Sequence, residues 1–106
     1  LKFTAKNNKG VIYFLEEGTE SAGLQHIISR HWKPNELMKY FDDIDSMTES
    51  MFIALKDKNF ISKNLKPGSN PPKWEYIYKV VTKSGQLSDF KFAIGDNGFI
   101  VSFYKT

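Results

Sequence analysis

The chain opens with two short segments whose residue pattern is typical of β-strands. Apolar and polar residues alternate in Leu1–Lys6, and Val11–Leu15 is an apolar run. The segment between them, Asn7–Gly10, has the Asn and Gly residues that favour a tight turn. We therefore expect an N-terminal β-hairpin that ends before Glu16.

A helical spacing of apolar residues follows from Ser21 to His31. One face of this expected helix carries residues at i, i+3, i+4 and i+7, namely Leu24, Ile27, Ile28 and His31. Thr19 or Ser21 is an acceptable N-cap, since each has a short side-chain oxygen. Pro34 disfavours helical geometry in the residue before it, so we expect the helix to end near His31.

Two more helices are expected before the chain changes to strands. One runs from Asn35 to Asp43, with an apolar stripe formed by Leu37, Tyr40, Phe41 and Ile44. The other begins at Ser46, because Ser46–Glu49 matches a capping box. Its expected inward-facing residues are Met47, Met51 and Leu55. The segment Lys63–Pro72 is rich in Pro, Gly, Ser and Asn, so we expect a loop there.

The rest of the chain has the pattern of a β-sheet. The expected strands are Trp74–Thr82, Leu87–Ile94 and Phe99–Tyr104, and short Gly-containing turns between them make neighbours antiparallel. The expected fold class is α+β, with an N-terminal hairpin and two to three helices packed on an antiparallel, mainly C-terminal β-sheet. We expect one domain over residues 1–106.

Alternation along the last two strands predicts which side chains share a face. In the last strand we expect inward Phe99, Val101 and Phe103, and outward Ile100, Ser102 and Tyr104. In the strand before it we expect inward Phe90, Phe92 and Ile94, and outward Lys91 and Ala93. Ser102, Tyr104 and Lys91 would then lie together, and a hydroxyl, a phenol and an ammonium group suit a phosphate. The alternative is the ordinary polar face of an antiparallel sheet.

Composition narrows the class of protein. The chain has 106 residues, of which 41% are hydrophobic and 25% charged, so it can bury a core without metal or disulfide support. Fifteen Lys plus Arg against twelve Asp plus Glu give a net charge of +3. This excess permits phosphate binding, and ordinary surface lysines explain it as well.

Several features are missing from the sequence. It has no cysteine, which excludes disulfides, thiolate nucleophiles and cysteine-bound zinc. It has no apolar run long enough to span a membrane, so we expect neither a membrane span nor a signal peptide in these 106 residues. Tight zinc-ligand spacings, phosphate-binding glycine loops and nucleophile elbows are also missing, so we expect neither a metal site nor a small-molecule cofactor. The alternative is a zinc site that a distant Asp completes. Because Leu1 is not an initiator methionine, we expect the chain to be a fragment of a longer protein or a processed product.

The candidate chemistry is concentrated near the end of the first expected helix, at His26, Arg30 and His31. His26 and His31 are the only two histidines of the chain. An unperturbed imidazole pKa of about 6.5 allows proton transfer near neutral pH, and the neighbouring arginine favours an anionic substrate. On an ideal helix, positions five apart diverge by about 140°, so the two rings can converge only at a helix end or a bend. Alternatively, His31 packs at the end of the apolar face or caps the helix, and Arg30 forms a surface ion pair.

Two segments together resemble a known superfamily. Gly23–His31 reads Gly-Leu-Gln-His-Ile-Ile-Ser-Arg-His, and Gly98–Tyr104 reads Gly-Phe-Ile-Val-Ser-Phe-Tyr. They resemble the barnase/EndoU/colicin/RelE-like superfamily of ribonucleases, and in particular its phage and polymorphic-toxin members. Those members often have a His-Ile-x-x-Arg-His helix motif and a last strand ending in Thr/Ser-x-Tyr. Relatives often have proline after that tyrosine, where this chain has Lys105.

The resemblance implies a metal-independent RNA endonuclease, frequently a tRNase, at the C-terminus of a contact-dependent growth inhibition toxin or a related toxin. The toxin would be secreted or surface-delivered and would act in the cytoplasm of a target bacterium, and a cognate acidic immunity protein would inhibit it. The implied catalytic residues are His26, His31, Arg30, Ser102 and Tyr104. Lys91 is added as a substrate-binding residue from strand alternation.

The implied reaction is attack of the ribose 2′-OH on the adjacent phosphorus, which leaves a 2′,3′-cyclic phosphate. We expect His26 to be the base or the acid, and Arg30, Ser102 and Lys91 to hold the phosphate. Tyr104 positions the substrate or stacks on a base, and His31 is the second proton-transfer group or a structural support. The alternatives are a non-catalytic module that binds RNA or a protein, and a metal-dependent nuclease.

Overall fold

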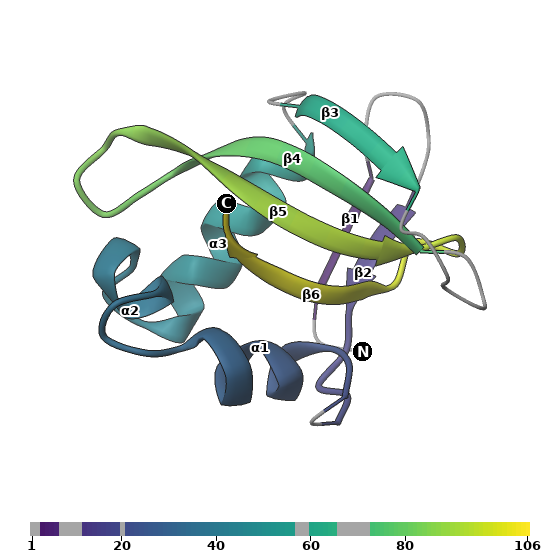
Figure 1. Ribbon diagram of the computed structural model, residues 1–106, viewed down its shortest axis with the longest axis horizontal. Coiled ribbons are helices and arrows are strands. Elements are labelled where there is room, and N and C mark those ends of the chain that lie inside the picture. Colours follow the sequence, from purple (N-terminus) through teal and green to yellow (C-terminus); the bar gives the residue numbers. More distant parts are fainter. Residues whose placement is uncertain (1–2, 7–11, 20, 57–59, 66–72) are drawn as a thin grey trace.

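A computed structural model describes residues 3–6, 12–19, 21–56, 60–65 and 73–106. The described elements, in chain order, are β1 (Phe3–Lys6), β2 (Ile12–Leu15), α1 (Leu24–His31), α2 (Leu37–Tyr40), α3 (Ile44–Lys56), β3 (Phe60–Leu65), β4 (Lys73–Val81), β5 (Leu87–Gly95) and β6 (Ile100–Lys105). Figure 1 shows the helices gathered against a twisted sheet formed mainly by the C-terminal half of the chain. The predicted α+β class is confirmed.

The main sheet has the strand order β3-β4-β5-β6, and each neighbouring pair is antiparallel. The predicted N-terminal hairpin is also confirmed, because β1 and β2 pair antiparallel. Its expected turn, residues 7–10, lies outside the described residues. A single parallel bridge between Phe14 and Phe99 joins the hairpin to the start of the last strand, where the Phe14 N–H donates to the Gly98 carbonyl at 3.0 Å.

The core lies on the side of the sheet against which α3 packs. The stripe predicted for this helix is buried, and it consists of Met47, Met51 and Leu55. Opposite it lie the inward side chains of β5 and β6, which include Phe90, Phe92 and Phe103. The rings of Phe90 and Phe103 stack at a centroid distance of 5.0 Å. We call this side the core face, and the side that carries Glu75, Lys91, Ser102 and Tyr104 the outer face.

The first helix begins later than predicted, at Leu24 rather than Ser21. Neither Thr19 nor Ser21 is its N-cap, because both lie before the cap position at residue 23. The N-cap is Gly23, whose φ of 91° favours glycine, and its N–H donates to the Val101 carbonyl at 2.9 Å. This bond ties the start of α1 to β6, and the two elements lie side by side in Figure 1.

The other two helices also differ from prediction at their ends. α2 covers only Leu37–Tyr40, because Phe41 is extended and places its ring in the core. α3 begins at Ile44, before the expected start at Ser46. Its first turn is capped by Asp43, whose carboxylate accepts the Ser46 N–H at 2.7 Å. That bond lowers the pKa of the Asp43 carboxyl.

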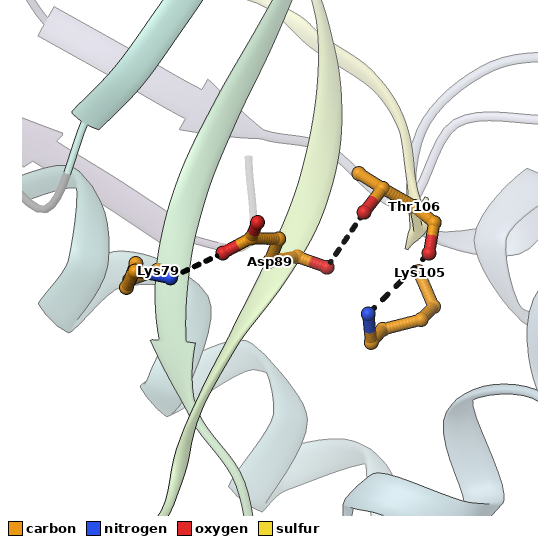
Figure 2. A network of polar contacts seen from close by, with 4 residues as sticks. All are labelled: Lys79, Asp89, Lys105 and Thr106. Carbon is orange, nitrogen blue, oxygen red and sulfur yellow. Dashed lines mark hydrogen bonds and ion pairs between the residues drawn. The ribbon is translucent and has the colours of Figure 1, made fainter.

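A further strand, β3, occupies residues 60–65 and enters the segment that was expected to be a loop. The remainder of that expected loop, residues 66–72, lies outside the described residues. At the other edge of the sheet, the end of β6 is fastened to β5. The Thr106 hydroxyl donates to the Asp89 carbonyl at 3.3 Å, while the Asp89 carboxylate accepts a 2.6 Å hydrogen bond from Lys79 (Figure 2). Among the described helices, none has the length and apolar content needed to cross a membrane.

Candidate active site

Strand register brings two of the predicted residues directly opposite each other on the outer face. Lys91 of β5 pairs with Tyr104 of β6, and Ala93 pairs with Ser102. Residues directly opposite in an antiparallel pair have their side chains on the same face. Lys91 also extends over its neighbour, with Nζ 5.9 Å from the centroid of the Tyr104 ring. Alternation therefore placed these three polar residues correctly.

The prediction that Ile100 faces outward is wrong, because the register shifts between Ala93 and Ile94. The shift opposes Ile100 to Ile94, and both side chains are buried in the core. An extra residue in one strand of a pair reverses the alternation on one side of it. Val101 is that residue, so Ser102 and Tyr104 keep the outer face while Ile100 does not.

The two histidines meet at the end of α1. Their ring centroids are 5.7 Å apart in an edge-to-face arrangement. His31 also stacks on Tyr104, with centroids 5.1 Å apart and ring planes 26° from parallel. This convergence is possible because His31 is the last residue of the helix. The helix motif and the last strand, far apart in sequence, thus form one aromatic cluster of His26, His31 and Tyr104.

Glu75 completes this part of the outer face, and sequence reasoning missed it. The Tyr104 hydroxyl donates to its Oε2 at 3.2 Å, and Lys91 Nζ lies 3.8 Å from the same oxygen. Burial, and secondarily the charge of Glu75, raises the pKa of Tyr104 to about 12. The phenol is therefore protonated near neutral pH and acts as a donor. Outward alternation along β4 was the available signal for Glu75.

The environment of His31 keeps its imidazole neutral. Burial lowers its pKa, and the charges of His26 and Arg30 act in the same direction, while Glu36 opposes them. Its Nδ1 is buried and has no hydrogen-bond partner among the described residues. The Glu36 carboxylate lies 3.6 Å away, which is an ion-pair distance longer than a good hydrogen bond.

Ser102 and Arg30 differ in their access to a ligand. Ser102 was expected on an open surface, yet it is only 6% exposed, and its hydroxyl oxygen has no partner among the described residues. A buried hydroxyl without a partner is unfavourable and is commonly satisfied by water or a ligand atom. Arg30 is exposed on α1, close enough for its charge to lower the pKa of His31.

Within the described parts of the chain, no group of three or more His, Asp or Glu is placed to hold a metal ion.

The aromatic cluster and the neighbouring Lys91 provide three chemical functions within a small area. Two imidazoles can accept and donate protons, an ammonium group can bind an anion, and a phenol can donate a hydrogen bond.

The sequence matches no protein-family model and no curated protein with which it was compared.

Proposed function

We propose that this protein is a metal-independent RNA endonuclease that cleaves by attack of the ribose 2′-OH. The observation that carries the proposal is the contact of His26 and His31 with each other and of His31 with Tyr104, next to Lys91. Proton-transfer groups and a phosphate ligand are the parts that this reaction needs. The choice of RNA, and of tRNA within it, rests on the resemblance of the helix motif and last strand to the ribonuclease superfamily.

In the proposed reaction, His31 is the base, because its lowered pKa leaves it proton-free near neutral pH. It takes the 2′-OH proton while the 2′ oxygen bonds to phosphorus. The bond from phosphorus to the 5′ oxygen breaks, and His26 gives that oxygen a proton. The products are a 2′,3′-cyclic phosphate end and a 5′-OH end.

The remaining residues bind the phosphate. Lys91 and Arg30 balance its charge, and the hydroxyl of Ser102 donates to one of its oxygens. Tyr104 supports His31 through stacking. Its ring already contacts His31 and lies under Lys91, so we assign it this supporting role in place of stacking on a nucleobase.

The same resemblance extends the proposal to the biological setting. The domain would be delivered as part of a larger effector into the cytoplasm of a target bacterium. An acidic immunity protein would cover the basic site, with electrostatic attraction accelerating association. If the purified product of the neighbouring gene leaves RNA cleavage unchanged, the proposal of an immunity protein is wrong.

The test is incubation of total tRNA with the protein in excess EDTA, followed by mass spectrometry of the fragment ends. The proposal predicts fragments with cyclic phosphate ends, and their loss in folded His26→Ala and His31→Ala variants. Binding without cleavage would support the alternative, a non-catalytic RNA-binding module. Cleavage that EDTA abolishes would support a metal-dependent nuclease.

A further inference from the structure

The turn after α1 returns the chain to the histidine that ends the helix. The Lys33 N–H donates to the His31 carbonyl at 3.0 Å, and the Glu36 N–H donates to the Lys33 carbonyl at 2.9 Å. Pro34 lies between these two bonds and cannot continue the helix. This short path brings the Glu36 carboxylate to the Nδ1 side of the His31 ring.

We propose that Glu36 is a positioning residue, which holds His31 with its proton on Nδ1 and leaves Nε2 free to accept the substrate proton. The proposal rests on the proposed function for its catalytic consequence. Its structural basis is that His31 Nδ1 is buried without a hydrogen-bond partner among the described residues, and that the Glu36 Oε1 lies 3.6 Å away. A movement of roughly 0.5 Å would bring the pair within hydrogen-bond distance.

Stacking limits the other orientations of the imidazole. Because His31 lies against the Tyr104 ring, its plane is fixed, and its two nitrogens point in different directions within that plane. A flip of the ring would direct Nδ1 away from the carboxylate. A carboxylate that accepts from one imidazole nitrogen determines which nitrogen can act as a base.

The groups that face His31 act on it from several elements. His26 and Arg30 lie on the same helix and favour the neutral form, whereas Glu36 favours the protonated form. From the sheet, Tyr104 contributes a neutral ring, and beyond it lie Lys91 and Glu75. Among these groups, Glu36 is the carboxylate that ion-pairs with His31.

The experiment compares the wild type with Glu36→Gln, and uses Glu49→Gln, at an exposed position of α3, as a matched control. Nitrogen-15 NMR of the imidazoles should show the Nδ1–H tautomer of His31 in the wild type. In Glu36→Gln, the population of the other tautomer should rise and the pKa of His31 should fall. The control should match the wild type in both respects.

Kinetics on an RNA substrate give the second readout. Glu36→Gln should lower kcat by about 10- to 100-fold, while KM stays near the wild-type value, because the carboxylate orients the base and does not bind the substrate. The acidic limb of the kcat/KM profile should move to lower pH. Glu36→Asp should recover part of the lost rate.

Two outcomes would overturn the inference. One is an Nε2–H tautomer in the wild type, and the other is a Glu36→Gln variant with unchanged tautomer and pH profile. Both can be recognised independently of the ribonuclease proposal, since the NMR measurement needs no substrate. A wild-type protein that fails to cut RNA would instead remove the proposed function and leave the tautomer assignment standing.

Discussion

Replacement of Lys91 by alanine should weaken RNA binding far more than replacement of a lysine on the same face. Lys91 Nζ lies 3.8 Å from the Glu75 carboxylate and over the Tyr104 ring, beside the histidine cluster. Lys79 is the control, since it lies on the same face and its ammonium group is held by Asp89 at 2.6 Å (Figure 2). That bond is much shorter than the 3.8 Å contact of Lys91 with Glu75.

The expected size of the effect follows from counterion release. Each phosphate contact by a lysine contributes about 0.7 to the slope of log K against log salt for single-stranded nucleic acid. Lys91→Ala should therefore reduce the slope by about 0.7 and weaken binding about tenfold at low salt. Lys79→Ala should leave the slope unchanged. Each of these solvent-accessible ion pairs contributes only about 0–1 kcal/mol to stability, so both variants should stay folded.

The assay is fluorescence anisotropy with a 2′-O-methyl RNA oligonucleotide, which cannot undergo attack by the 2′ oxygen. Titrations at several salt concentrations give the slope, and urea unfolding verifies that each variant is folded. A Lys91→Ala variant that keeps the wild-type slope would show that Lys91 makes no phosphate contact. Equal losses of affinity in Lys79→Ala and Lys91→Ala would show that the position of Lys91 beside the histidines has no special effect on binding.

Three further results are expected. Glu75→Gln should bind the same oligonucleotide about two- to fivefold more tightly, because a carboxylate near the phosphate is removed; weaker binding in the same titration would contradict this. Tyr104→Phe removes the hydrogen bond to Glu75 and should lower the free energy of unfolding in urea by about 1 kcal/mol. It should keep most of the cleavage rate, because the ring that supports His31 remains. Loss of cleavage in the folded variant would assign a role to the hydroxyl. Since the folded-state pKa of His31 lies below its ordinary 6.5, the unfolded chain binds more protons as the pH falls below 6.5, and stability is lost there. Urea unfolding across this pH range should show a smaller loss in His31→Phe, and an equal loss would argue against a buried neutral imidazole.

The sequence predicted the elements best where one face of each strand packs on the core and the turns between strands are short. Alternation and turn residues located β4, β5 and β6 within one residue at each end, since each has a clear apolar face. β3 was missed because it is an edge strand, and Lys63, Asn64 and Leu65 are exposed. The bulge near Val101 was also missed, since it depends on pairing with another strand. Local patterns therefore predicted the sheet but not its irregularities.

Only part of the candidate site could be predicted, again because local patterns do not show contacts between distant segments. His26, His31, Lys91 and Tyr104 could be identified because residue type and local period are visible in one chain. The two carboxylates were not, since Glu75 reaches Tyr104 through strand register and Glu36 reaches His31 through a chain reversal. The start of α1 was also predicted incorrectly, because Gly23 is held there by a hydrogen bond to Val101, which is distant in sequence. Contacts between distant segments decide these features.

The most direct test is an NMR titration with an uncleavable 2′-O-methyl dinucleotide, in which the carbon-bound ring protons of both histidines and of Tyr104 are followed. If one phosphate binds among these side chains, the ring signals of His26, His31 and Tyr104 should shift together with a single dissociation constant, while the signals of Met47 and Met51 on α3 stay unchanged. Shifts confined to α3, or no shift of either imidazole at saturation, would contradict the proposed site.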